Sequence, residues 1–236
     1  MKPDLKRFLF NIWKTLAVII VPLLILSLTL SVLINCRWLY EQGFEKYEVS
    51  QQTGFTPAQL KTAASALIGY FNNSEEYLNL HLEKDGADIQ VFNEREMLHL
   101  KDVKGLIRLN YLILGICLVL GGGFFLYLYF KRQHEFKKEG GMVLLQGGIF
   151  SLMLLGGIGL IALLDFQSFF TRLHLLGFSN DFWLLDPTKD YLIMFFPKGF
   201  WADSAVMLGI SIGVLASGTT ICGRLLGKSS PSNQPV

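Results

Sequence analysis

Two histidines, His99 and His174, have surroundings that could support proton transfer. His99 lies in a predicted helix with Asp102 three residues later on the same face, where a carboxylate would hold one imidazole tautomer and raise its basicity. His174 follows Phe169 and Phe170 in a stretch rich in aromatic rings. These residue types indicate general acid-base chemistry near neutral pH. Each also has an ordinary interpretation, as part of a mixed-charge surface helix for His99 and as a polar membrane anchor for His174.

The other polar side chains favour structural roles. His81 and His134 are typical of solvated residues, and Asp186 before Pro187 is typical of a turn. No serine or cysteine lies in a nucleophile elbow and no His-Glu-x-x-His sequence occurs, which argues against an acyl-enzyme and a zinc hydrolase. Two histidines with one aspartate leave metal binding open as an alternative. Three cysteines at different predicted depths indicate neither a disulfide nor a metal site: Cys36, Cys117 and Cys222.

The composition is that of a membrane protein, because 51% of the residues are hydrophobic and only 17% are charged. A helix needs about 20 apolar residues to cross a bilayer. Four segments without charged side chains meet this requirement: 16–34, 111–130, 142–164 and 204–223. The first is too long for the apolar core of a secretory signal. Glycines in these spans predict close helix packing and not a nucleotide loop: Gly121, Gly122, Gly123, Gly147, Gly148, Gly156, Gly157 and Gly159.

The basic residues set the predicted orientation, since lysine and arginine in short flanks resist translocation. They gather at the amino terminus, in the turn between the second and third spans, and after the fourth span: Lys2, Lys6, Arg7, Lys14, Lys131, Arg132, Lys137, Lys138, Arg224 and Lys228. Both termini are therefore predicted in the cytoplasm, with residues 37–110 and 165–203 outside. The net charge of +2 indicates no nucleic-acid surface.

The first outer segment is long enough to form a small α+β domain. Thr56 before a proline predicts a helix start, and the apolar positions that follow repeat at helical spacing to about residue 72. Residues 77–82 and 87–92 alternate with period two around a glycine turn, which predicts a β-hairpin. Asn93 followed by Glu96 resembles a capping box and predicts a second helix that leads into the membrane.

The second outer segment is rich in aromatic side chains, which favour the headgroup layer of a bilayer. We expect it to lie at the membrane interface. Its rings are Phe166, Phe169, Phe170, Phe178, Phe182, Trp183, Tyr191, Phe195, Phe196, Phe200 and Trp201.

The predicted fold class is a mainly α membrane protein, a four-transmembrane-helix bundle with a small extracytoplasmic α+β domain between helices 1 and 2 and an aromatic interfacial segment between helices 3 and 4. The segments are a basic cytoplasmic amino terminus with helix 1 (1–35), the α+β domain (36–110), helices 2 and 3 with a basic turn (111–164), the interfacial segment (165–203), helix 4 (204–226) and a disordered cytoplasmic tail (227–236).

Two stretches of this sequence resemble the lipoprotein intramolecular transacylases of Gram-positive bacteria, a family within a wider set of four-span bacterial membrane proteins. The residues that carry the resemblance are His174, Asn180-Asp181-Phe182-Trp183-Leu184-Leu185-Asp186-Pro187, Asp190-Tyr191-Leu192-Ile193, Phe196-Pro197 and Phe200, and the 96–104 stretch with His99 and Asp102-Val103-Lys104. The order of spans and outer segments also matches, so the resemblance covers nearly the whole chain.

This resemblance implies a membrane acyltransferase. The acyl chain at the second glycerol position of a diacylglyceryl lipoprotein would move to the α-amino group of that lipoprotein's own cysteine, giving a lyso-form N-acyl lipoprotein. The implied partners are the diacylated lipoprotein and membrane lipid, with no nucleic acid and no cofactor. We expect a monomer in the cell membrane with its active site at the outer leaflet.

The resemblance also implies roles for particular residues. One of His99 and His174 would act as base and the other as acid or oxyanion donor, with Asp102 orienting His99. Asn180, Trp183 and Asp186 would shape the mouth of the site. Two other functions stay open: a non-catalytic four-span scaffold or sensor whose outer domain binds a partner, and a different outer-leaflet acyltransferase or lipid hydrolase.

Overall fold

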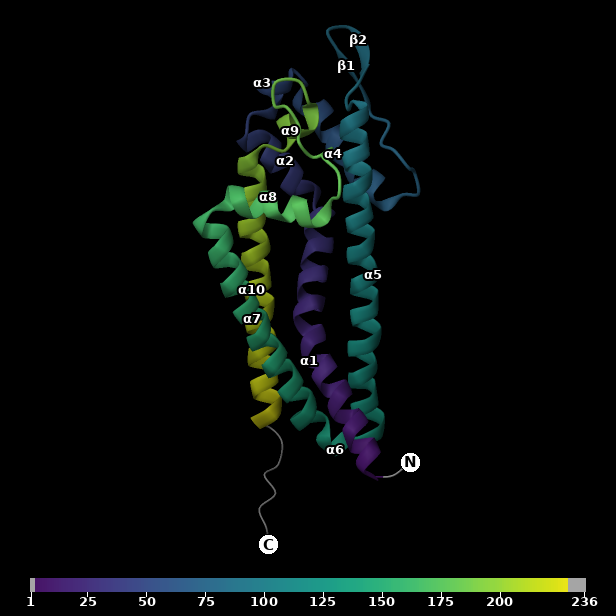
Figure 1. Cartoon of the computed structure of the whole chain (residues 1–236), viewed down its shortest axis with the longest axis vertical. Coiled ribbons are helices and arrows are strands. Elements are labelled where there is room, and N and C mark those ends of the chain that lie inside the picture. Colours follow the sequence, from purple (N-terminus) through teal and green to yellow (C-terminus); the bar gives the residue numbers. More distant parts are fainter. Residues whose placement is uncertain (1–2, 229–236) are drawn as a thin grey trace. The chain divides into compact units, whose positions relative to one another are not determined.

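The computed structural model describes residues 3–228 and is mainly helical (Figure 1). Its elements are α1 (Pro3–Ile34), α2 (Arg37–Lys46), α3 (Val49–Thr53), α4 (Pro57–Asn72), β1 (His81–Lys84), β2 (Ala87–Gln90), α5 (Glu94–Lys131), α6 (Gln133–Glu135), the π-helix η1 (Phe136–Gly140), α7 (Gly141–Leu164), α8 (Phe166–Gly177), α9 (Tyr191–Phe195) and α10 (Lys198–Lys228).

Four of these helices, α1, α5, α7 and α10, are long and apolar enough to cross a membrane, and each contains one of the predicted spans. The mainly helical fold with four candidate spans is therefore confirmed. The predicted tail begins inside α10 at residue 227, and its residues 229–236 lie outside the described part of the chain.

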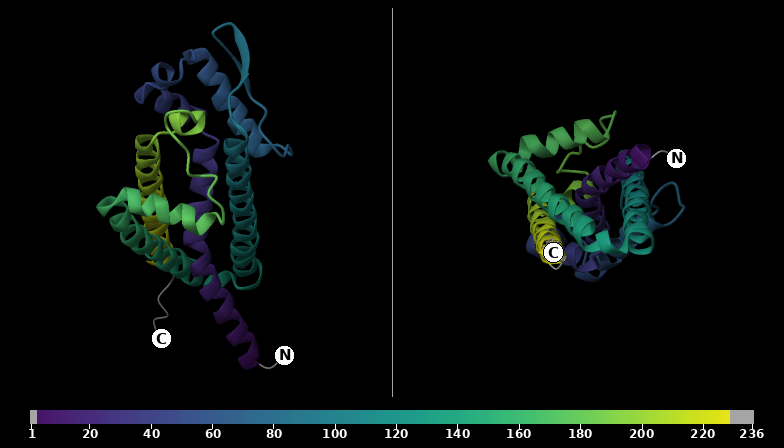
Figure 2. Two further views of the ribbon diagram at one scale, coloured as in Figure 1. Left: turned by 45° about the horizontal axis from the view of Figure 1, so that its top comes forward. Right: turned by 90° about the horizontal axis from the view of Figure 1, so that it is seen from below.

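The chain divides into two compact units. The helical unit comprises Met1–Leu30, Asn110–Ile161 and Leu208–Val236, and the mixed unit comprises Ser31–Leu109 and Ala162–Met207. The two predicted outer segments thus belong to one unit. In the helical unit, α7 and α10 run alongside each other (Figure 2).

Glycines allow α7 and α10 to approach closely. A Cβ on Gly148 would lie 2.8 Å from the backbone nitrogen of Thr220, so a larger residue would force the helices apart. The prediction of close packing does not extend to every glycine, because a Cβ on three others in α7 would meet nothing within 4 Å: Gly156, Gly157 and Gly159. The buried core of this unit is Ala17, Val21, Ile25, Phe124, Leu128, Val143 and Ala216.

The predicted hairpin is present in the mixed unit but is shorter than expected. β1 and β2 pair antiparallel with Leu82 opposite Ile89. They are joined by Asp85 and Gly86, both at positive φ (53° and 77°), as a tight two-residue turn requires. Residues 77–80 are not part of the strand, because the chain just before them is held by side chains of α5, described below.

The core of the mixed unit is aromatic. α4 begins after Thr56, as predicted, and the structure adds a capping box there, in which the Thr56 side chain accepts from the backbone N–H of Gln59. Phe195 of α9 is fully buried, and its ring centroid lies 5.6 Å from that of Phe44 and 5.7 Å from that of Phe92. Phe195 of the second outer segment thus packs against rings of the first, and such contacts join the two segments in one unit.

Candidate active site

The start of α5 is fixed by a capping box that also holds α9. The Asn93 side chain accepts a hydrogen bond from the backbone N–H of Glu96 (3.1 Å), and the Glu96 carboxylate accepts one from the backbone N–H of Asn93 (2.8 Å). The same carboxylate, 1% exposed, accepts a third from the backbone N–H of Leu192 (2.6 Å). The predicted cap is therefore present, and it also joins the first turn of α5 to residues that follow it far along the sequence.

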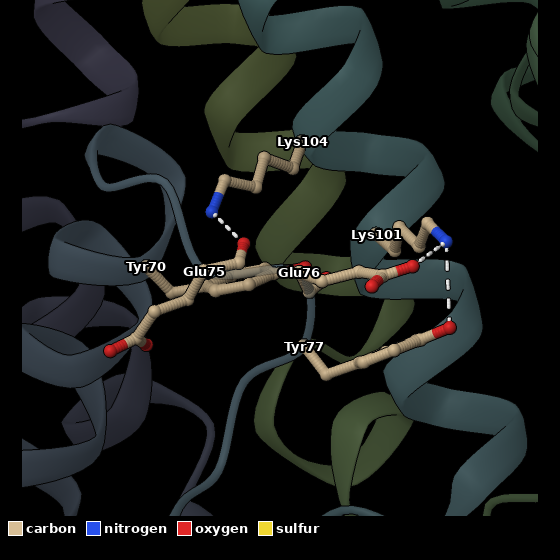
Figure 3. Close-up of polar contacts among 6 residues, drawn as sticks. All are labelled: Tyr70, Glu75, Glu76, Tyr77, Lys101 and Lys104. Atoms are coloured by element: carbon tan, nitrogen blue, oxygen red, sulfur yellow. Dashed lines mark hydrogen bonds and ion pairs between the residues drawn. The ribbon is translucent and has the colours of Figure 1, made fainter.

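Three cations on α5 bind the segment after α4, and two of them, Lys101 and Lys104, are drawn in Figure 3. Lys104 donates to the side-chain oxygen of Asn73 (2.8 Å) and to the backbone oxygen of Glu75 (2.6 Å), and its ammonium lies 3.9 Å from the centre of the Tyr70 ring. Lys101 pairs with the Glu76 carboxylate (2.6 Å). Arg108 donates to the backbone oxygen of Asn73 (3.0 Å). These bonds draw residues 73–76 toward α5 and set where that helix lies in the mixed unit.

Replacing Lys104 with methionine is expected to destabilise the mixed unit. Lys104 is only 3% exposed, so the substitution removes two hydrogen bonds from a buried ammonium, a loss of about 2 kcal/mol. A lower thermal denaturation midpoint in detergent micelles is the measurement. The matched control is Lys101→Met on the same helix, whose ion pair with Glu76 is solvent-exposed and contributes little to stability. Equal shifts in the two variants would contradict this role for Lys104.

The structure brings His99 and His174 together. His99 lies in the second turn of α5 and is 8% exposed, whereas His174 lies in the last turn of α8 and is half-buried. Their ring centroids are 6.1 Å apart. The Phe178 ring contacts both imidazoles, at 5.1 Å from His99 and 5.6 Å from His174. The two histidines thus form one cluster, set among aromatic rings.

The orientation of the His174 ring assigns its tautomer. Its Nδ1 lies 2.9 Å from the backbone oxygen of Phe170, one turn earlier in α8. A carbonyl oxygen only accepts hydrogen bonds, so Nδ1 carries the proton. In the neutral ring the lone pair is then on Nε2, which is the atom able to take up a proton.

Two buried nitrogens beside this ring lack hydrogen-bond partners among the described residues: Nδ1 of His99 and Nε1 of Trp183. The Trp183 ring centroid lies 5.0 Å from that of His174. A buried polar group without a partner costs about 1–3 kcal/mol, so such groups need an explanation. A ligand that supplies an acceptor at this cluster would relieve the cost. An indole N–H can only donate, and burial among rings favours an uncharged imidazole at His99.

Asp102 does not orient His99 through the orphaned Nδ1, in contrast to the expected role. Its carboxylate accepts a hydrogen bond from the side-chain amide of Asn180 (2.8 Å), which also accepts one from the backbone N–H of Phe182 (3.1 Å). Asp102 and Asn180 therefore connect α5 to the loop that follows α8. Because this loop carries Trp183, the pair helps to fix the aromatic side of the histidine cluster.

Asp186 has the turn role typical of its sequence. Its carboxylate accepts from the backbone N–H (2.9 Å) and the hydroxyl (2.7 Å) of Thr188, and these bonds hold the pKa of Asp186 below its ordinary value. Its backbone N–H donates to Asp190 (2.7 Å). Asp186 thus shapes the loop without contacting either histidine. Among the residues that the structure describes, no three histidine, cysteine or acidic side chains gather in a way that could hold a metal ion.

Sequence reasoning missed three contributors: Phe178, which contacts both imidazoles, the Glu96 carboxylate as a cap for α9, and Arg95, which donates to the backbone oxygen of Asp181. Only Glu96 had a usable signal, because it belongs to a recognisable capping box. The contacts of Phe178 with His99 and of Arg95 with Asp181 span long sequence separations, and a single sequence contains no pattern that reports them.

Comparison with known proteins places this arrangement among membrane enzymes. The family model described as lipoprotein intramolecular transacylase Lit matches residues 15–201. One solved structure of the membrane integral lipoprotein intramolecular transacylase Lit from Bacillus cereus matches with a TM-score of 0.78 at 21% identity, over 94% of this chain and 97% of that one. A variant of the same protein with one histidine changed to arginine gives 0.75 at 20% identity, over 98% and 97%. No curated protein matches.

Proposed function

Because this chain belongs to the lipoprotein intramolecular transacylase family and is a membrane acyltransferase, we propose that it acts on a diacylglyceryl lipoprotein and uses histidine chemistry. The acyl chain at the second glycerol position moves to the α-amino group of the lipidated cysteine of the same molecule. A bond between nitrogen and the acyl carbon forms, the ester bond to the glycerol oxygen breaks, and one proton passes from the amine to that oxygen. The supporting observation is the pair of imidazoles 6.1 Å apart with the lone pair of His174 on Nε2.

His174 transfers the proton from the amine to the glycerol oxygen. Its Nε2 takes the amine proton as nitrogen attacks and gives the same proton to the departing glycerol oxygen, so one residue serves as base and then as acid. An α-amine has a pKa of about 7.7 and is partly neutral near pH 7, which makes the first step a modest task. Since both reacting groups belong to one molecule, proximity supplies much of the rate.

His99 and Trp183 stabilise the negative charge that develops on the acyl oxygen. A neutral imidazole can donate one N–H but cannot deliver a free proton without becoming an anion, so His99 is better suited to hydrogen bonding than to proton transfer. Trp183 supplies a second N–H from the same cluster. Donors placed at a developing oxyanion lower the barrier because they strengthen as the charge forms. Both atoms are shielded from water, and neither has a hydrogen-bond partner within residues 3–228, so each is free to donate to an entering ester.

The proposed location is the outer leaflet of the cell membrane, with both termini in the cytoplasm, as the basic flanks of the spans favour. The active form is a monomer, because the proposed residues all belong to one chain. The acyl chain and the amine both come from the substrate, so the reaction needs no soluble donor. Asn180 and Asp186 shape the mouth of the site through the loop that they fold.

The decisive experiment uses purified protein and a synthetic diacylated lipopeptide with a free α-amine. Mass spectrometry with fragmentation is expected to show an acyl chain on nitrogen and a free hydroxyl on the glycerol, at unchanged total mass. A scaffold or sensor would leave the lipopeptide unaltered. A lipid hydrolase would instead release fatty acid and lower the mass. Added phospholipid without lipopeptide provides the control for other acyltransferase activity.

Replacing Trp183 with phenylalanine is expected to lower kcat about 10²-fold with little change in KM, because the ring remains and only the N–H donor is lost. Trp38→Phe is the control, since Trp38 is 56% exposed. In the indole region of a ¹H–¹⁵N NMR spectrum, the Trp183 signal should move downfield when a phosphonate analogue of the tetrahedral intermediate binds. An unmoved signal with full activity of the variant would exclude the oxyanion role.

A further inference from the structure

Two pockets lie beside the first turns of α5, and Arg95 lines both. The first has a volume of about 620 Å³ and is lined by Glu94, Arg95, Leu98, Asn180, Asp181 and Phe182. The second has a volume of about 400 Å³ and is lined by Asn93, Arg95, Leu184, Asp186, Lys189 and Asp190. One wall of each comes from α5 and the other from the loop between α8 and α9. The shared arginine makes the two pockets neighbours.

The first pocket adjoins the histidine cluster. Leu98 precedes His99 in the chain, and Asn180, which lines the pocket, binds Asp102 one turn after His99. Arg95 lies one turn before His99, on the side away from the apolar residues 111–130 of the same helix. One helical turn rises about 5.4 Å along the axis. An extended peptide advances about 3.3 Å per residue, so two of its residues cover that distance.

The lining of the first pocket suits a polypeptide better than an acyl chain. Glu94 and Asp181 are exposed, and within the described chain no ion pair or hydrogen bond engages either carboxylate. Arg95 is partly satisfied, because its guanidinium donates to the backbone oxygen of Asp181. Two free carboxylates against one engaged cation leave this pocket acidic, so a cationic side chain is the group that it would attract.

We propose that these pockets bind the polypeptide that follows the lipidated cysteine of the substrate, with the first pocket holding a lysine or arginine side chain two or three residues downstream of the cysteine. The inference rests on the proposed function, because it assumes that the reacting ester lies at the histidines. It assigns substrate selection to Glu94 and Asp181, which are separate from the residues that carry out the reaction.

The test compares diacylated lipopeptides that carry lysine, alanine or glutamate at the third position with a diacylated cysteine amide that has no peptide. The wild-type protein is expected to prefer the lysine peptide over the glutamate peptide by roughly three- to tenfold in kcat/KM, mainly through KM. The double variant Glu94→Gln, Asp181→Asn should lose this preference and keep the rate on the cysteine amide. Glu83→Gln, an exposed acidic residue of β1, is the matched control and should keep the preference.

The outcomes separate the two proposals. No turnover of any lipopeptide or of the cysteine amide would overturn the proposed function and this inference with it. Turnover of all substrates at equal kcat/KM, or an unchanged lysine preference in the double variant, would overturn the inference and leave the transacylase reaction standing.

Discussion

Replacing His174 with asparagine is expected to lower the rate of acyl migration about 10³-fold. The asparagine amide can still donate to the backbone oxygen of Phe170 as Nδ1 does, so the packing of α8 is kept. What disappears is Nε2, the only atom of this side chain that can accept the amine proton. Mass spectrometry of the diacylated lipopeptide gives the rate, and the thermal denaturation midpoint gives the state of the fold.

The dependence on pH separates a lost base from a misplaced side chain. If the base is missing, the residual rate should rise as the pH passes the ordinary pKa of an α-amine, about 7.7, because the amine then loses its proton without help. His81→Asn, on the exposed face of β1, is the histidine control and should retain full activity. Full activity of the His174 variant would remove this histidine from the mechanism.

Substitutions of His99 by leucine and by asparagine should differ sharply, although the two residues have nearly the same shape. Leucine removes every donor, and the rate is expected to fall about 10²- to 10³-fold. Asparagine places an amide N–H near the position of Nδ1, the buried atom that has no partner within the described residues. The asparagine variant should therefore be at least tenfold faster than the leucine variant. Rates on the diacylated lipopeptide are the measurement.

The comparison of these two variants tests the role of His99 directly. If His99 delivered a proton, an amide could not replace it, and both variants would be equally impaired. If it only filled space, both would be nearly as active as the wild type. Because His99 is buried, the thermal denaturation temperature of the asparagine variant is measured as well, and it should equal that of the wild type.

Much of the fold follows from local patterns. The four spans, the start of α4 at Thr56 and the capping box of Asn93 with Glu96 depend on residues within one helix or its cap, and each is present. The length of the hairpin could not be predicted, because it depends on Lys104 and its neighbours on α5 drawing the preceding segment away. Nothing in the alternating pattern of residues 77–82 reports that competition.

The candidate site shows the same division. His99 and His174 could be selected from residue type and local setting, and the structure places their rings together. The hydrogen-bond partner of Asp102 could not be predicted from the sequence. Asn180 lies 78 residues away, and His99, a nearer candidate, had the spacing expected on one helical face. Proximity along a helix face permits a contact, but tertiary packing decided which one forms.

The bond between His174 and Phe170 has a consequence for turnover. An imidazolium keeps the proton on Nδ1, so the same bond persists whether the ring is neutral or charged. The ring can therefore gain and lose its second proton in one fixed orientation. Each catalytic cycle therefore begins with Nε2 of His174 in the orientation needed to accept a proton, and the side chain does not have to rotate before the next substrate binds.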